Sequence, residues 1–170
     1  MSFFPRIFKA IFISMPYLLT MNDVLRFSVF TFFALLIGIV DFLKQKIPDI
    51  LLLILLSALV TIDYLSPLTG AASPPVIRAL TAVIIFGLFC AVYHIRGGLG
   101  FGDVKYAAVI AYFLGPFKIL PGLLLAVFSG LIYWGFGHFI FGWKKEKRFA
   151  FGPWLGLGAI IAGLIKWSVV

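Results

Sequence analysis

The chain has few charged residues and only one cysteine, and each shortage excludes a class of protein or of binding site. Only 12% of its 170 residues are charged, whereas 63% are hydrophobic, including 20 phenylalanines. A soluble domain of this length cannot bury so much apolar surface, because its surface is too large for its volume. The single cysteine, Cys90, excludes an internal disulfide and a cysteine-based zinc site. The sequence therefore predicts an all-α membrane protein, with no metal or cofactor.

Acidic residues are scarcer than basic ones. The chain has six aspartates and glutamates and 14 lysines and arginines, which gives a net charge of +8. In a soluble protein this excess would indicate nucleic-acid binding. Here the bases lie between hydrophobic runs, where retention on the cytoplasmic side explains them. We therefore expect a lipid bilayer around the chain and no nucleic-acid partner.

The hydrophobic runs predict a polytopic bundle of about six transmembrane helices. About 20 apolar residues are needed to cross roughly 30 Å of hydrocarbon. Such runs lie at about 24–42, 50–68, 76–93, 97–120, 121–143 and 149–167, the fourth being interrupted by Gly115-Pro116. Residues 24–170 thus form one predicted transmembrane domain. Residues 1–23 precede it as an amphipathic or short hydrophobic segment, which either lies in the interface or makes a seventh crossing.

The positions of the bases predict the sidedness of the bundle. The connections after the first, third and fifth runs carry eight bases: Lys44, Lys46, Arg96, Lys105, Lys144, Lys145, Lys147 and Arg148. The opposite ends carry three: Arg78, Lys118 and Lys166. This bias places the first set in the cytoplasm and the chain in the cytoplasmic membrane. Asp23 and Asp63 then fall at the outer face, where we expect them to be solvated.

Two other aspartates end or begin predicted spans on the cytoplasmic side. Asp41 follows the first apolar run, and Asp103 opens the fourth. A carboxylate at bilayer depth costs a few kcal/mol, so it is usually functional, paired or close to water. The alternative is that both are interfacial residues, with Asp103 serving as a favourable charge at a helix N-terminus. Their sequence contexts favour a functional role.

Those contexts are two short motifs. Asp41 begins "DFLKQKIPD", in which the Pro48-Asp49 pair follows seven residues later. Asp103 ends the box formed with Gly100 and Gly102 in "GGLGFGDVK". Glycine permits close approach of another backbone, as an extended peptide substrate would require. A glycine-rich loop alone is weak support for such a site.

Together with "RFAFGPWLGLGA" at 148–159, these motifs resemble the GxGD aspartic proteases of the prepilin peptidase, or type IV leader peptidase, family. The resemblance covers residues 30–165 and implies catalytic roles for Asp41 and Asp103, with Gly100 and Gly102 in the active-site loop. Pro48, Asp49 and Lys105 match supporting positions, although Lys105 can equally anchor a helix end at the headgroups. Asp49 is the rival to Asp41, but its spacing fits the family less well.

The resemblance also implies the reaction and its substrates. Two aspartates sharing a proton would hydrolyse a prepilin-like protein at its short cytoplasmic leader. Larger family members carry an additional cytoplasmic segment associated with N-methylation. Only about seven residues separate Asp41 from the second span, so we expect cleavage without methylation. The sequence indicates neither the particular pilin nor the oligomeric state.

Two readings from other classes remain open at this point. Intramembrane aspartates and Gly-Pro-broken helices also suit a small ion-coupled or proton-coupled carrier, although the absence of an obvious repeat disfavours it. A non-enzymatic assembly subunit of a secretion apparatus is the third reading. Cleavage of a prepilin by the purified chain separates these alternatives.

Overall fold

A computed structural model describes residues 21–65, 73–96, 100–141 and 150–165, and all regular structure within them is helical. The five helices are α2 (Met21–Lys44), α3 (Asp49–Leu65), α4 (Pro75–Arg96), α5 (Phe101–Phe141) and α6 (Gly152–Leu164). The prediction of an all-α chain is confirmed. The first 20 residues of the predicted N-terminal segment lie outside the described residues.

Three helices are long and apolar enough to cross a membrane, within α2, α4 and α5. Their apolar stretches leave large side chains exposed, such as Leu43 and Val83, at 75% and 67%. Exposed apolar side chains of this kind are stable in contact with lipid, whereas their exposure to water costs free energy. The chain is therefore a membrane protein. Helices α3 and α6 have 17 and 13 described residues, so the count of six spans stays a prediction.

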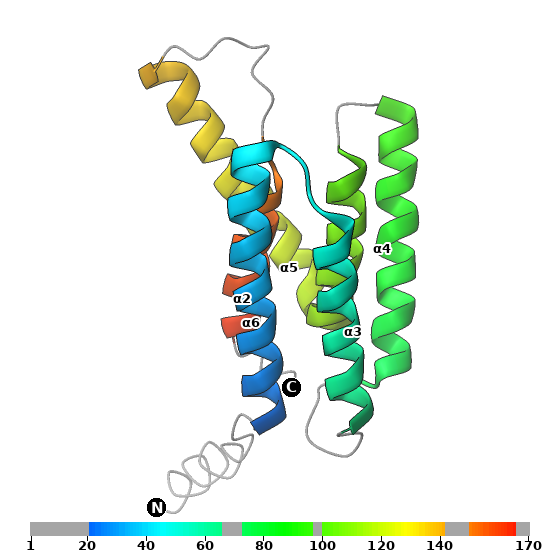
Figure 1. Cartoon of the computed structure of the whole chain (residues 1–170). Helices are drawn as coiled ribbons and strands as arrows, with labels where there is room; N and C mark the ends of the chain where they lie inside the picture. The colour runs from blue at the N-terminus through cyan, green and yellow to red at the C-terminus, as the bar shows by residue number, and fades with distance from the viewer. Residues whose placement is uncertain (1–20, 66–72, 97–99, 142–149, 166–170) are drawn as a thin grey trace, which may run out of the picture.

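Helix α5 is broken at Gly115, and this break replaces the predicted boundary between the fourth and fifth spans. Gly115 has φ 70° and ψ −178°, a backbone conformation that is essentially restricted to glycine. Pro116 follows and lacks the N–H that a continuous helix needs. The two parts of α5 run in opposite senses along the bundle (Figure 1). The boundary expected at 120–121 was thus five residues too late.

The alternation of helix directions brings distant segments to one end of the bundle. The C-terminal end of α2 and the N-terminal ends of α5 and α6 all lie toward the top of Figure 1. The start of α4 lies toward the other end. Gly115 is next to it, because a Cβ there would lie 2.8 Å from Oγ of Ser73 and 3.8 Å from Cγ of Arg78. Asp41 and Asp103 therefore occur at the same end, as the sequence predicted.

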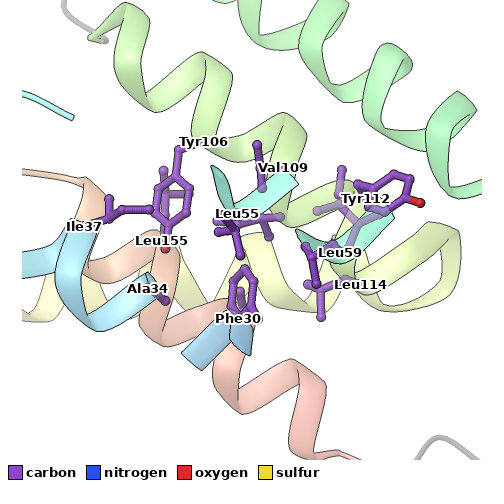
Figure 2. Packing of buried hydrophobic residues seen from close by; sticks show 14 of the residues in the cluster. Phe30, Ala34, Ile37, Leu55, Leu59, Tyr106, Val109, Tyr112, Leu114 and Leu155 are labelled. Carbon is purple, nitrogen blue, oxygen red and sulfur yellow. The ribbon is translucent and has the colours of Figure 1, made fainter. Parts of the chain in front are cut away.

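The core packs α2, α3, α5 and α6 through apolar and small side chains. Figure 2 shows Phe30, Leu55 and Leu59 meeting residues of α5, and Tyr106 lying beside Ile37 and Leu155. The rings of Phe30 and Phe113 stack with centroids 3.9 Å apart. This packing fixes the angle between α2 and the first part of α5, and so the placement of their aspartates.

Helices α5 and α6 approach each other along small residues. A Cβ built at Gly158 would lie 2.5 Å from the carbonyl oxygen of Gly122, so nothing larger than glycine fits there. Ala126 and Ala162 follow these glycines by four residues and are fully buried. Such small-xxx-small spacing allows close backbone packing in membranes, where dispersion contacts rather than water exclusion hold helices together.

Asp63 contradicts the expectation that it is solvated. Its side chain is 6% exposed and forms an ion pair with Arg26 at 2.7 Å and another with Arg78 at 3.3 Å. The hydroxyl of Tyr112 donates a further hydrogen bond to Asp63 at 3.0 Å. The physical reason is that neighbouring helices supply enough positive charge and donors to replace water. Arg26 and Arg78 thereby share one carboxylate as their ion-pair partner within the protein.

Candidate active site

Asp41 lies in the last turn of α2 and is almost completely buried, with 5% of its surface exposed. The backbone N–H of Gly152, the first residue of α6, donates a hydrogen bond to Oδ2 of Asp41 at 3.0 Å. The N-terminus of a helix carries unpaired N–H groups and a partial positive charge, which favour a carboxylate. The start of α6 therefore both desolvates Asp41 and orients it.

Asp103 lies in the first turn of α5 and is partly buried. Its carboxylate has a backbone hydrogen bond with Gly100, and its own N–H donates to the Gly100 carbonyl at 3.0 Å. A carboxylate reaching back to the residue before the helix is one half of a capping box. Asp103 thus lies at a helix N-terminus, as the sequence predicted, and helps to cap it.

Asp41 and Asp103 also act on each other. The two carboxylates are within electrostatic reach of each other, although 62 positions of sequence separate them. The negative charge of Asp41 therefore repels that of Asp103. Like charges that share a partly dry site favour a state in which one is protonated. The structure therefore brings the two aspartates that the motifs singled out to the same end of the bundle, within electrostatic reach of each other.

The two box glycines have different neighbours. A Cβ at Gly100 would lie 3.0 Å from Oδ2 of Asp103, so glycine there leaves room for the carboxylate. A Cβ at Gly102 would lie 3.0 Å from Cβ of Ile47, which belongs to the connection between α2 and α3. The face of Gly102 that was expected to admit a substrate backbone is thus packed against the protein's own chain.

That connection has a defined geometry. Gln45 adopts φ 52°, and its N–H donates to the carbonyl of Asp41 at 2.8 Å, which ends α2 with a left-handed residue. The Pro48 carbonyl then accepts from the N–H of Leu51 at 3.1 Å as α3 begins. Ile47 lies between these two turns and is partly buried against the core.

Asp49 and Lys105, two of the predicted supporting residues, contact each other. Nζ of Lys105 lies 2.6 Å from Oδ2 of Asp49, with side chains that are 34% and 68% exposed. The same ammonium lies 5.0 Å from the ring centre of Phe101. This ion pair ties the start of α3 to the start of α5. Asp49 is exposed and paired with a base, whereas Asp41 is buried beside the start of α6.

Three residues near the aspartates were not assigned by sequence reasoning. Gly152 lies within the "FGP" string that carried the family resemblance, but nothing in the string indicated a hydrogen bond to Asp41. Pro153 packs on Gly38, where a Cβ would lie 3.5 Å from the proline Cα. Ile47 precedes Pro48 and gave no signal at all, because an isoleucine beside an apolar span is unremarkable in sequence.

Tyr106 lies one turn after Asp103 and is fully buried. Its hydroxyl has no hydrogen-bond partner among the residues that the structure describes, and it is within electrostatic reach of Asp41. A Cβ at Gly156 would lie 2.8 Å from this hydroxyl. Tyr106 therefore depends on a glycine of α6 for its space, as Asp41 does.

Comparison with known proteins identifies a family for the sequence that carries this site. The profile of the type IV leader peptidase family matches residues 28–135, which include Asp41 and Asp103. A protein of Escherichia coli (strain K12) named prepilin leader peptidase/N-methyltransferase is 31% identical over 79% of this chain and 61% of its own length. One of Bacillus subtilis (strain 168) with the same name is 25% identical over 84% of this chain and 56% of its own.

The chain thus spans little more than half the length of these curated relatives. No solved structure gave a significant match. The family profile nevertheless covers well over half of the residues, including the helices that carry both aspartates. The chain belongs to the type IV leader peptidase family.

Proposed function

We propose that this chain is a membrane-embedded aspartic endopeptidase that cleaves the short leader of prepilin-like proteins. The observation that supports it most is the meeting of Asp41 and Asp103 at one end of the bundle, within electrostatic reach of each other. Both belong to the segment matched by the family profile, and two relatives are named prepilin leader peptidases.

The proposed reaction uses the two carboxylates with one proton between them. The ionised member removes a proton from water, and the resulting hydroxide attacks the scissile carbonyl carbon. The protonated member donates to the carbonyl oxygen as charge develops on it. Collapse of the tetrahedral intermediate breaks the C–N bond, and the leaving nitrogen takes up a proton from the pair. Of the two carboxylates, Asp41 is the one that the backbone N–H of Gly152 holds in place.

The proposed location follows from charge. The connections at the aspartate end carry the eight-base set defined above, which the positive-inside rule assigns to the cytoplasm. A leader on the cytoplasmic side of a hydrophobic helix would then reach the pair without crossing the membrane. Reporter fusions that place the connection at 142–149 outside the cell would contradict this orientation.

The decisive experiment is cleavage of a prepilin by the purified chain in detergent, with no ion gradient. Asp41→Asn and Asp103→Asn should each abolish cleavage, and the double variant should be scarcely worse than either, because the pair acts as one unit. Asp49→Asn is the matched control: an exposed aspartate eight residues away, which should retain substantial activity.

Two results would contradict the proposal in different ways. If Asp49→Asn is inactive while Asp41→Asn still cleaves, the first aspartate has been misassigned. If both Asp41→Asn and Asp103→Asn cleave normally at confirmed membrane insertion, the chain is not an aspartic protease. Cleavage in detergent without a gradient also distinguishes a peptidase from a carrier or an assembly subunit.

A further inference from the structure

The side chain of Ile47 touches both helix starts that surround the aspartates. Its Cβ lies 3.0 Å from the position of a Cβ on Gly102, and its Cδ1 lies 3.1 Å from that position on Gly152. Gly102 immediately precedes Asp103, and Gly152 holds Asp41 through its N–H. One isoleucine therefore fills the space between the backbone segments next to the two carboxylates.

The placement of Ile47 depends on Asp41 itself. The N–H of Gln45 donates to the Asp41 carbonyl, and the positive φ of Gln45 turns the chain back toward the bundle. Pro48 then begins the next helix, so Ile47 is held between a fixed helix end and a fixed helix start. The exposed Asp49–Lys105 ion pair lies beside this connection, at the start of α3.

We propose that Ile47 is a positioning residue that sets the separation of Asp41 and Asp103, an inference that rests on the proposed peptidase function. A branched side chain in contact with both glycine-bearing turns prevents the starts of α5 and α6 from closing on each other. The glycines are required because any Cβ there would push Ile47 outward. An aspartate pair that shares a proton needs a fixed separation, and a misplacement of about 1 Å can cost roughly 100-fold in rate.

The test is a graded series at residue 47, with prepilin cleavage as the readout. Ile47→Ala removes every side-chain atom beyond Cβ, and with them the contact with Gly152. It should lower kcat at least tenfold, on the order expected for a sub-ångström displacement of a carboxylate, and leave KM little changed. Ile47→Val removes only Cδ1, the atom nearest Gly152, and should give a smaller loss of kcat. Ile50→Ala is the control, because Ile50 is 72% exposed near the same connection.

A second readout measures the separation without catalysis. In a Cys90→Ala background, Asp41→Cys and Asp103→Cys are combined and treated with thiol cross-linkers of short and long spacer. With Ile47 present we expect one preferred spacer length. With Ile47→Ala the yield should shift between the two reagents, while Ile50→Ala leaves it unchanged. This readout stays informative even if Ile47→Ala weakens folding, since Ile47→Val can be compared in the same way.

The outcomes separate this inference from the proposed function. Normal kcat in Ile47→Ala, or a reduced kcat with an unchanged cross-linking pattern, would overturn the positioning role while leaving the aspartates as the catalytic pair. An increase in KM with an unchanged kcat would also overturn the positioning role, because it would assign Ile47 to substrate binding. Activity in Asp41→Asn and Asp103→Asn would refute the peptidase function itself, whatever the cross-linking shows.

Discussion

Gly152 donates its backbone N–H to Oδ2 of Asp41 at 3.0 Å, across 111 positions of sequence. A Cβ on Gly152 would lie 2.7 Å from the same oxygen. The relationship explains why a glycine begins α6: the helix start must come within hydrogen-bond distance of a carboxylate, and any side chain would displace it.

Gly152→Ala should therefore impair cleavage with little effect on membrane insertion. Either Asp41 or the start of α6 must shift by several tenths of an ångström, which weakens the hydrogen bond and misplaces the carboxylate. We expect a loss of about tenfold or more in kcat. Gly135→Ala is the matched control, because a Cβ there meets nothing within 4 Å. Equal activity of the two variants would show that the contact does not matter for the reaction.

Gly115→Ala should destabilise the fold rather than the reaction. A non-glycine residue held at φ 70° and ψ −178° costs on the order of 1–3 kcal/mol, and the new Cβ would also lie 2.8 Å from Oγ of Ser73. Because Gly115 lies at the end opposite the aspartates, cleavage per folded molecule should persist below the unfolding temperature. Thermal unfolding in detergent checks this. A variant as stable as Gly135→Ala would contradict the assigned strain.

The chain should cleave without methylating. Two of its relatives are named as both peptidase and N-methyltransferase. The connection from α2 to α3 contains only four residues between Lys44 and Asp49, so no methyl-donor site can be built there. Mass spectrometry of the cleaved product, with a methyl donor supplied, should find an unmodified N-terminus. A methylated product made by the purified chain alone would contradict the prediction.

The fold class and the two aspartates were accessible from the sequence because they depend on local signals. Long apolar runs predict helices, and a carboxylate at the end of a run is conspicuous at bilayer depth. The partners of those aspartates were not accessible. Gly152 and Ile47 act through contacts between residues 55 to 111 positions apart, which no local pattern encodes.

The environment of Asp63 was mispredicted for a related reason. Because Asp63 lies near the end of an apolar run, the sequence suggested that water surrounds its carboxylate. In the folded protein two arginines and a tyrosine contact that carboxylate instead. The interruption at Gly115-Pro116 was recognised in the sequence, but the boundary between the fourth and fifth spans was placed at Pro121, because only the backbone conformation of Gly115 decides between the two prolines. In both cases the packing of distant helices overrides a local preference.

The Asp63 network gives the last prediction. Asp63→Asn removes the ion-pair partner that Arg26 and Arg78 share, and their side chains are only 5% and 8% exposed. Removing one partner of a buried ion pair typically costs about 3–5 kcal/mol, because the remaining charge is desolvated and unpaired. Tyr112→Phe, by contrast, removes a single hydrogen bond to a charged group and should cost about 1.5–3 kcal/mol.

The measurement is unfolding in detergent of both variants beside Asp49→Asn. Asp49 belongs to an exposed ion pair, so its loss should cost no more than about 1 kcal/mol. The expected order of stability is therefore Asp49→Asn above Tyr112→Phe above Asp63→Asn. Cleavage per folded molecule should be retained in all three, because Asp63 lies in the last turn of α3, and the C-terminal ends of α3 and α2 lie at opposite ends of the bundle (Figure 1). If Asp63→Asn unfolds like wild type, the two arginines are solvated and the network does not hold α2, α3, α4 and α5 together. If it remains folded but inactive, the network acts on the aspartate pair through the length of α5.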